Sequence, residues 1–386
     1  MSGQRRKHSQ KKKNHKAVVY IIGLLVILIA VIGIKNISGA PDGSDIRLTD
    51  EGYTHANRFK SSVAVTGIDV SSHQGDDINW EMVKSSGVDF VFVRAGVRLP
   101  EDGSIHKDKC FDRNVKNARK AGLLIGAYFY SQATTTEEAA EEAGFMLDTV
   151  SGKDIDLPLV IDYELYQGGR LSAKAQSGEL FAASQYNDIV TAFTSRIEQS
   201  GYDSGVYANY DMLTNYMDAS LIAGQTEIWI AQYNNYCSFA PSYMFWQCSD
   251  SAQVGGIDGN VDHDFWYIQP NKVYSASSSD QASSSDSSDT SDSANTSDSA
   301  DTSDQTSASN AISIGECTVE FDKDAYRIKK RRATPDIEVS YNGAALKEGS
   351  DYTCTPIRNI DTGTGYVFIR GIGDYKDWKA VPFTIK

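Results

Sequence analysis

The chain has 386 residues, of which 40% are hydrophobic and 23% are charged. This composition is typical of folded domains, and the length is sufficient for two or three of them. The formal net charge of -14 argues against a nucleic-acid partner, because binding to a phosphate backbone requires a basic surface.

The amino-terminal region is predicted to anchor the chain in a membrane. Residues 1–16 are strongly basic, and residues 17–34, "AVVYIIGLLVILIAVIGI", carry no charge. As a helix this span reaches about 27 Å, close to the roughly 30 Å of a bilayer core, whereas a cleavable signal has an apolar region of about 7–15 residues. We therefore predict a transmembrane signal anchor at 17–34, followed by a juxtamembrane spacer at 35–61.

Basic residues before the apolar span place residues 1–16 in the cytoplasm as a short tail. The rest of the chain is then outside the cell, attached to the membrane by a single pass. The alternative is a signal peptide cleaved after "ISGA", which would lead to secretion.

Residues 62–270 alternate between strand-like and helix-like segments, which implies a parallel sheet with crossover helices. The last three strands are joined by about ten residues each, too few for a helical crossover of a dozen or more. We therefore predict an incomplete α/β barrel whose first five strands belong to β/α units. Strands are expected at 65–72, 88–96, 123–131, 157–165, 204–210, 226–233, 242–249 and 259–266, and helices at 79–87, 111–122, 134–150 and 179–201.

Acidic, amide and aromatic residues recur at the expected carboxyl ends of these strands, where barrel enzymes hold their chemistry. Each alone has a simpler explanation, such as a loop cap or a core ring. Their convergence on one end of one barrel is the argument for a site. They are Asp69, Arg94, Tyr128, Tyr130, Asp162, Glu164, Tyr207, Asn209, Trp229, Gln232, Tyr233, Trp246, Gln247, Asp262 and Asp264.

The stretch "PLVIDYELY" brings two carboxylates to the end of an apolar strand. Side chains two residues apart share a face of a strand, so Asp162 and Glu164 are expected to point into the barrel mouth while Tyr163 points away. Repulsion between two close carboxylates raises the pKa of one of them, and an acid beside a carboxylate is what hydrolysis of a glycosidic bond needs. The alternative is a pair of solvated acids that open a polar loop.

Six ordered segments carry a family resemblance: "GIDVSSHQGDDINW", "FVFVRAG", "GAYFYS", "VIDYEL", "IWIAQY" and "FWQCSDSAQVGGIDGNVDHDFW". Together they resemble family 25 of the glycoside hydrolases, the lysozymes (N-acetylmuramidases) that cleave peptidoglycan. The resemblance covers residues 67–266. It implies a (β/α)5(β)3 TIM-like barrel and hydrolysis of the β-1,4 bond between N-acetylmuramic acid and N-acetylglucosamine in glycan strands. No metal or nucleotide motif occurs in the sequence, and we predict no cofactor.

The resemblance also implies roles for single residues. Glu164 matches the general acid/base, and Asp162 matches a carboxylate that either attacks the anomeric carbon or orients the 2-acetamido group of the substrate as nucleophile. Asp69 and Asp262 match the remaining acids of the cleft. Phe129 replaces a His found in many members, so contacts near it are expected to differ. The implied substrate contacts are Arg94, Tyr128, Tyr130, Tyr207, Trp229, Gln232, Tyr233 and Trp246.

Two other functions fit a barrel of this kind. The first is a catalytically inactive protein that binds cell-wall glycan, which would be favoured if the acids were missing. The second is a hydrolase of another family, such as a chitinase, whose corresponding strand has a further acid where this chain has Val160. Both alternatives fit the sequence less well than a muramidase.

The carboxyl-terminal third is predicted to hold a Ser/Asp-rich disordered linker at 271–310 and a small all-β domain at 311–386. Asn342-Gly343 between two alternating runs indicates a hairpin. The domain resembles the immunoglobulin-like repeats of Gram-positive surface proteins, which implies contact with a cell-wall polymer; a spacer role is the alternative. We expect the barrel to fold without it.

Five cysteines are too few for a disulfide scaffold in a chain of this length. Cys237 with Cys248, and Cys317 with Cys354, are the pairs that an oxidising compartment would allow, and Cys110 would be left over. No cysteine has the spacing of a metal or redox site.

The predicted anchor can be tested by cell fractionation. We expect the intact protein to sediment with membranes, and a variant lacking residues 1–40 not to, because the apolar span is the anchor. An immunoblot of the medium, membrane and soluble fractions measures this. Recovery of most of the wild-type protein in the medium, with a new amino terminus near residue 41, would instead identify a cleaved signal peptide.

Overall fold

The computed structural model describes residues 47–180, 182–275 and 311–386. Within these residues, no helix is long and apolar enough to cross a bilayer. The predicted tail and membrane span at 1–34, and almost all of the predicted linker at 271–310, lie outside the described residues.

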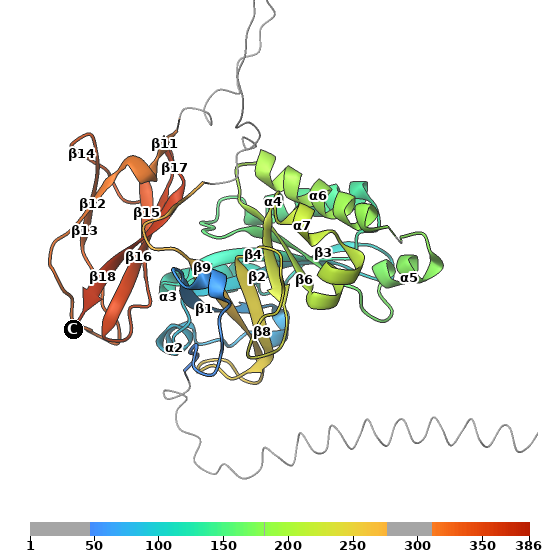
Figure 1. The fold of residues 1–386 in the computed structure, drawn as a ribbon, viewed down its shortest axis with the longest axis horizontal. Coiled ribbons are helices and arrows are strands. Elements are labelled where there is room, and N and C mark those ends of the chain that lie inside the picture. The colour runs from blue at the N-terminus through green and yellow to red at the C-terminus, as the bar shows by residue number, and fades with distance from the viewer. Residues whose placement is uncertain (1–46, 181, 276–310) are drawn as a thin grey trace, which may run out of the picture. The chain divides into compact units, whose positions relative to one another are not determined.

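A closed barrel of eight strands forms the larger part of the described chain (Figure 1). Seven strands follow one another in parallel, and β9 closes the barrel by pairing antiparallel with both β8 and β1. The incomplete α/β barrel predicted from the sequence is therefore confirmed. The strands are β1 Val63–Val70, β2 Phe90–Arg98, β4 Leu124–Ser131, β5 Leu159–Tyr163, β6 Ser204–Asn209, β7 Glu227–Ala231, β8 Phe245–Ala252 and β9 Val261–Ile268, and β3 Ile105–Lys107 extends the edge of β2.

The helices lie outside the barrel, and the two longest, α4 and α6, pack against each other (Figure 1). The side chain of Thr135 caps α4 by accepting a hydrogen bond from the backbone N–H of Glu138 (3.2 Å), as a Thr before two acids predicts. The described residues between β7 and β8, and between β8 and β9, hold no helix. The helices are α2 Trp80–Ser85, α3 Phe111–Ala121, α4 Thr136–Val150, α5 Arg170–Ser177, α6 Ala183–Gln199 and α7 Ala219–Ile222, with short helical turns η1 Asn57–Phe59, η2 Ser72–Gln74, η3 Met212–Tyr216 and η4 Ile314–Glu316.

The direction of β9 corrects one expectation. Asp262 and Asp264 were expected at the carboxyl end of a strand, but β9 is antiparallel to its neighbours, so its amino end lies at the barrel mouth. The short connection at 253–260 can only return the chain as a hairpin, which reverses the strand. Asp262 still reaches the mouth, opposite Asp69 in the β1–β9 ladder, whereas Asp264 lies one layer deeper.

The interior of the barrel is apolar toward its base. Gly67 and Gly126 make room there, because a Cβ at these positions would lie 2.2 Å from the ring of Phe90 and 2.3 Å from that of Phe92. Both rings therefore fill the interior together with Trp266. The inward-facing polar residues lie at the opposite end of the strands, at the mouth of the barrel.

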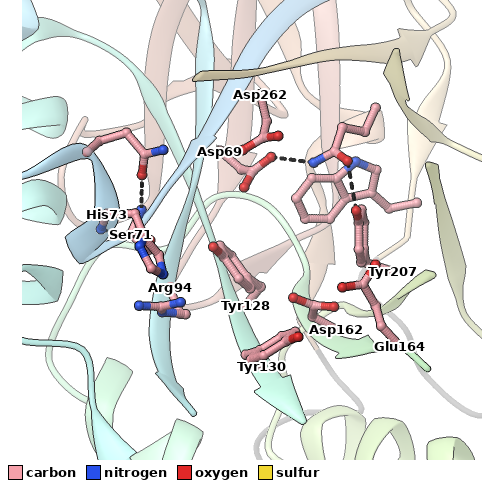
Figure 2. Close-up of a pocket in the computed structure, with 13 residues that line it drawn as sticks. Asp69, Ser71, His73, Arg94, Tyr128, Tyr130, Asp162, Glu164, Tyr207 and Asp262 are labelled. Atoms are coloured by element: carbon pink, nitrogen blue, oxygen red, sulfur yellow. Dashed lines mark hydrogen bonds between the residues drawn. The ribbon is translucent and has the colours of Figure 1, made fainter. Parts of the chain in front are cut away.

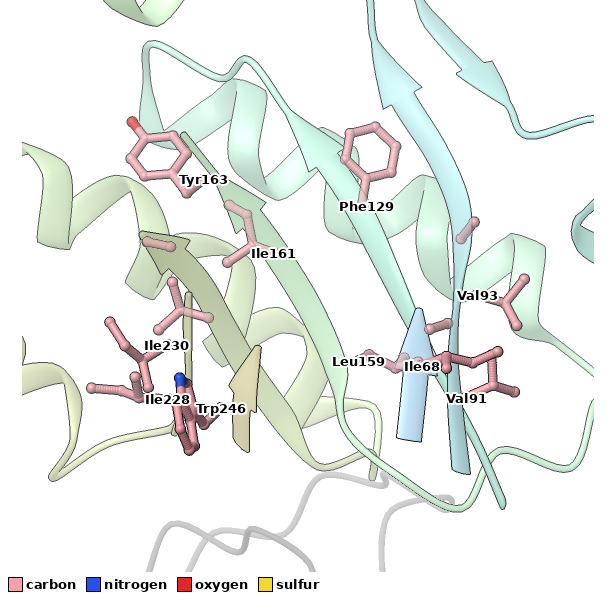
Figure 3. Close-up of a cluster of buried hydrophobic side chains, with 14 of the residues drawn as sticks. Ile68, Val91, Val93, Phe129, Leu159, Ile161, Tyr163, Ile228, Ile230 and Trp246 are labelled. Atoms are coloured by element: carbon pink, nitrogen blue, oxygen red, sulfur yellow. The ribbon is translucent and has the colours of Figure 1, made fainter. Parts of the chain in front are cut away.

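Alternate residues of the same strands face outward and pack under the helices. Figure 3 shows this outer layer, which includes Ile68, Val91, Phe129, Ile161 and Trp246. The two layers follow from the period of two in a strand, in which neighbouring residues point to opposite faces.

The carboxyl-terminal region is all-β, as predicted. Asn342 and Gly343 both have positive φ, 50° and 79°, and form the two-residue turn between β13 and β14, which confirms the predicted hairpin. Its resemblance to surface-protein repeats stays a prediction. The strands are β10 Val273–Tyr274, β11 Ile312–Ser313, β12 Thr318–Phe321, β13 Ile337–Tyr341, β14 Ala344–Ala345, β15 Tyr352–Ile357, β16 Gly363–Gly371, β17 Tyr375–Lys376 and β18 Trp378–Ile385.

The base of the barrel and the small domain share one apolar cluster. Trp266 at the base of β9 packs against Trp378 and Phe368, with ring centroids 5.3 and 5.9 Å apart. Phe90 belongs to the same cluster. The small domain therefore covers apolar side chains that the barrel alone would leave in water, which argues against our expectation of an independently folding barrel.

Polar contacts accompany this cluster. Arg370 of the small domain donates to the backbone oxygen of Asp156 (2.6 Å) and to the carboxylate of Asp203 (3.1 Å). Arg332, from the basic run at 328–332, donates to the backbone oxygen of Ala121 (2.6 Å). Arg332 is thus directed to the barrel.

All five cysteines are free thiols. The pairs Cys237 with Cys248 and Cys317 with Cys354 are therefore not formed. Four of the thiols are buried, among them Cys110, whose Sγ donates to Oδ1 of Asp76 (3.0 Å).

Removal of the small domain is predicted to destabilise the barrel. We expect a chain ending at residue 270 to melt at a lower temperature than the full chain, because Phe90 and Trp266 lose their cover. Trp378→Ala should cost about 3–5 kcal/mol of stability, as large buried rings do. Calorimetric melting of both proteins measures the effect.

Phe383→Ala is the matched control, because Phe383 lies on the same strand as Trp378 but packs in the small domain's own cluster. Amide exchange in β2 and β9 should rise in Trp378→Ala and much less in Phe383→Ala. Equal melting temperatures for the truncated and full chains would show that the two domains are independent after all.

Candidate active site

A cavity of about 370 Å³ opens at the mouth of the barrel (Figure 2). Most of its lining comes from the carboxyl ends of the parallel strands, and β9 contributes from its amino end. The lining residues are Asp69, Ser71, His73, Gln74, Arg94, Tyr128, Tyr130, Asp162, Glu164, Tyr207, Trp229, Gln247 and Asp262.

All four acids predicted as catalytic line this one cavity: Asp69, Asp162, Glu164 and Asp262. Parallel pairing places Asp162 between its neighbours on β4 and β6, and antiparallel pairing places Asp262 opposite Asp69. Tyr163, the last residue of β5, lies between the two acids and points the other way, where its hydroxyl donates to a backbone oxygen of the outer layer (3.2 Å). Asp162 and Glu164 thus share the inner face, as the strand period predicts.

Burial is the main influence on the pKa of these acids. It raises the pKa of Glu164 to about 7, and the nearby charge of Asp262 adds to the effect. The sequence predicted that repulsion between Asp162 and Glu164 raises the pKa of one of them; for Glu164 the leading cause is burial and the contributing charge is that of Asp262. Burial, followed by the charge of Asp250, raises the pKa of Asp262 to about 6.

The pKa values of Asp69 and Asp162 lie well above the ordinary range for the same principal reason, burial. For Asp162, the charge of Glu164 adds to the rise and the guanidinium of Arg94 opposes it. One oxygen of Asp162, Oδ1, is buried and has no hydrogen-bond donor among the described residues. The described residues therefore leave the hydrogen bonding of this buried oxygen incomplete.

Gln247 links the two sides of the cavity. Its Oε1 accepts from the hydroxyls of Tyr207 (2.7 Å) and Tyr233 (3.0 Å), and its Nε2 donates to Oδ2 of Asp69 (2.7 Å). The two hydroxyl donors set the amide orientation and so direct the amide N–H to Asp69. Gln247 stood out at its strand end, but we did not place it among the substrate contacts.

Arg94 and His73 lie together on one side of the cavity, and Asp162 and Glu164 on the other (Figure 2). Arg94 is held by Asp108, to which its Nε donates (3.0 Å), and by Ser72, whose hydroxyl accepts from Nη2 (3.2 Å). The guanidinium is thus fixed before any ligand binds.

Ser71, His73 and Gln74 were not predicted as site residues. They come from the turn after β1, where Ser71 accepts from the backbone of His73 (3.1 Å) and Gln74 accepts from the backbone of Ser71 (2.9 Å). Their signal was in the segment "SSHQG", which belongs to the family resemblance but carries no obvious chemistry of its own. Asp108, which holds Arg94, follows β3 and gave no signal.

Four of the predicted aromatic contacts line the cavity: Tyr128, Tyr130, Tyr207 and Trp229. Trp229 is only 2% exposed and stacks on Phe92, with centroids 4.5 Å apart. Tyr130 is more accessible and stacks with Tyr166 at 5.9 Å. Among these rings, Tyr130 therefore offers the more open surface to a sugar.

The structure does not bring the other three predicted contacts into the lining. Trp246 faces the outer layer and is fully buried, because it alternates with the inward Gln247 on β8. Gln232 holds the loop after β7 through Ser238 (2.9 Å). Tyr233 is exposed and reaches the site only through the hydroxyl that donates to Gln247. Trp246 is therefore corrected to a core residue.

In the described part of the chain, no group of His, Cys, Asp and Glu side chains is arranged to hold a metal ion. Besides Ser71, His73 and Trp229, the side chains that converge here are acids, amides, phenols and one guanidinium. An acid with a pKa of about 7 can both donate and accept a proton near neutral pH.

The residues of the barrel resemble those of known proteins. A model of the family described as "Glycosyl hydrolases family 25" matches residues 68–257. Lysozyme M1 of Streptomyces globisporus is 28% identical over 205 residues, which cover 51% of this chain and 66% of that protein. The chain thus spans just under two thirds of that relative.

The uncharacterized protein YegX of Escherichia coli strain K12 is 31% identical over 214 residues, 54% of this chain and 71% of that protein. Among solved structures, the bacterial lysozyme from Streptomyces coelicolor is 27% identical, with a TM-score of 0.45, over 53% of this chain and 92% of that one. By the family match across its barrel, the chain belongs to family 25 of the glycosyl hydrolases.

Proposed function

We propose that the protein is a muramidase, which hydrolyses the β-1,4 bond between N-acetylmuramic acid and N-acetylglucosamine in peptidoglycan. The observation that carries the proposal is the pair Asp162 and Glu164, which both line the cavity at the mouth of a family 25 barrel, with the pKa of Glu164 raised to about 7. The name of the relative lysozyme M1 supports the same reading.

Glu164 is the proposed general acid and base. Protonated, it gives a proton to the glycosidic oxygen as the bond to the leaving sugar breaks; ionised, it takes a proton from the water that completes hydrolysis. The first step needs the protonated carboxyl group and the second needs the ionised one, so the two together need a pKa close to the working pH. Burial of Glu164 supplies this, because it penalises the ionised form.

Asp162 is proposed to orient the 2-acetamido group of the substrate, whose oxygen then attacks the anomeric carbon. Its Oδ1 supports this role, because it is a buried acceptor without a donor of its own and could accept from the acetamido N–H. Direct attack by Asp162 on the anomeric carbon is the alternative. Asp69 and Asp262 are proposed to position the sugar, with Arg94 and Tyr130 among the contacts.

A catalytically inactive glycan-binding protein on the same barrel is the second candidate function. All four acids line the cavity, which favours an enzyme over this candidate. Attachment to the membrane through residues 17–34, and contact of the small domain with a wall polymer, remain proposals from the sequence.

Glu164→Gln tests the proposed function. The amide keeps the size of the side chain but cannot exchange a proton, so we expect normal folding, retained glycan binding and a loss of about 10²–10⁴-fold in turnover. Turnover is measured on purified peptidoglycan, with the new reducing-end sugar identified by mass spectrometry. Glycans that lack the N-acetyl group should resist the wild-type enzyme if Asp162 orients that group.

A folded Glu164→Gln variant within tenfold of wild type would remove Glu164 from the mechanism. A new reducing end on N-acetylglucosamine would contradict the proposed bond. Binding of peptidoglycan without any cleavage by the wild type would favour the inactive glycan-binding protein. A covalent sugar ester on Asp162 would establish direct attack in place of the acetamido route.

The same variant makes a prediction about pH and stability. The pKa of Glu164 is raised by burial to about 7, so its contribution to stability is present below its ordinary pKa of 4.5 and is lost as pH rises through about 7. Glu164→Gln escapes this loss. Its melting temperature relative to wild type should therefore be higher at about pH 8 than at about pH 5.

Glu137→Gln is the matched control. Backbone and side-chain donors at the start of α4 lower the pKa of Glu137, so this residue is ionised throughout that interval. The melting temperature of Glu137→Gln relative to wild type should stay constant between the two pH values. A constant difference for Glu164→Gln as well would show that Glu164 does not keep its proton in the folded protein.

A further inference from the structure

Asp264 is a carboxyl group that the proposed mechanism does not use. It lies on β9 two residues beyond Asp262, on the same inward face but one layer deeper, and its exposed fraction is 0%. It does not line the cavity. An ionisable group in this position is costly unless its charge is neutralised or well hydrogen-bonded.

The hydrogen bonds of Asp264 are incomplete for an ionised carboxylate. Its Oδ1 accepts from Nε1 of Trp229 (2.9 Å), while its Oδ2 is buried without a donor among the described residues. Asp264 and Asp69 face the interior from neighbouring strands, with Asp264 opposite Gly67 in the β1–β9 ladder, and a side-chain hydrogen bond between the two carboxyl groups acts on the pKa of Asp264. Two carboxyl groups can form such a contact only if one of them carries a proton.

The guanidinium of Arg94 lines the same cavity as Asp69 but is paired with Asp108 (2.8 Å), so it does not replace that proton. No described ion pair includes Asp69 or Asp264. The titratable groups that act on the two carboxyls, or feel their charge, are acids, phenols and a thiol. They are Asp262 on β9, Asp162 on β5, Tyr128 on β4, Tyr207 on β6, Tyr233 after β7 and Cys248 on β8.

We propose that Asp69 and Asp264 share one proton and act as a single monoanionic pair, in which Asp264 is the positioning residue for Asp69. Gln247 donates to Oδ2 of Asp69 (2.7 Å), and the shared proton holds the carboxyl group from the Asp264 side. The proton is assigned to the pair as a whole and not to either carboxyl group alone. Burial and the neighbouring Asp262 raise the pKa of Asp264 well above the ordinary range, as the pair requires.

The pair matters for catalysis because of its charge. A second negative charge beneath the cavity would repel the ionised forms of Asp262 and Asp162 and would release Asp69 from its fixed orientation. With one charge, Asp69 stays ordered at the edge of the cavity. This consequence for turnover rests on the proposed function, but the shared proton itself does not.

Infrared difference spectroscopy tests the proton directly. At about pH 8.5, above the pKa of about 7 of Glu164, the wild-type protein should show a carbonyl band of a protonated carboxyl group that is missing in Asp264→Asn. The band is lost because the substituted amide donates to Asp69 and leaves that carboxyl group ionised. Asp89→Asn is the control: Asp89 is equally buried but pairs with Lys84 (2.6 Å), so its replacement should remove an ionised carboxylate band.

Turnover separates positioning from packing. Asp264→Asn keeps an acceptor for Trp229 and a donor for Asp69, and should lose less than about tenfold in kcat; Asp264→Ala keeps neither and should lose about 10²-fold. An unchanged protonated-carboxyl band in Asp264→Asn would overturn the proposal, as would equal losses of turnover in the two folded variants. If the wild type is inactive on peptidoglycan, the proposed function fails, and the infrared result still decides whether the proton is shared.

Discussion

The withdrawal of carboxyl groups from water at the barrel mouth is the constraint on which the rest of the site depends. Four acids line one cavity and a fifth lies beneath it, and burial is the leading cause of the raised pKa of each. Such a cluster cannot be fully ionised, because like charges repel strongly where water is scarce. Retained protons, which proton-transfer chemistry requires, follow from the packing that surrounds the mouth.

The layered interior of the barrel keeps water away from the acids at the mouth. Below the acids, Phe90, Phe92 and Trp266 fill the space that Gly67 and Gly126 leave open. The floor is completed by the small domain, so a β-sheet encoded beyond a long polar segment contributes to the environment of residues encoded far upstream. Catalytic electrostatics and domain packing are therefore parts of one arrangement.

Much of the barrel and of its acidic cluster could be predicted from the sequence, because both depend on local patterns. Strand period and strand ends led to Asp162 and Glu164 and to their shared face. The same patterns could not decide which of the neighbours Trp246 and Gln247 points into the barrel, because the alternation along a strand fits either choice. Nor could they reveal the reversal of β9 or the burial of Asp264, which depend on how strands pair across the barrel. The contact between the two domains leaves no mark in an alternating strand pattern.

The shared apolar cluster limits how this protein can change by recombination. Domains that each have a hydrophobic core of their own can be separated or exchanged without exposing either core. Here the face of one module completes the hydrophobic core of the other, through Trp378 and Phe368 against Trp266. A replacement domain would need a complementary apolar surface, because otherwise the apolar side chains at the base of the barrel would be exposed to water. The two coding segments are therefore expected to be inherited together.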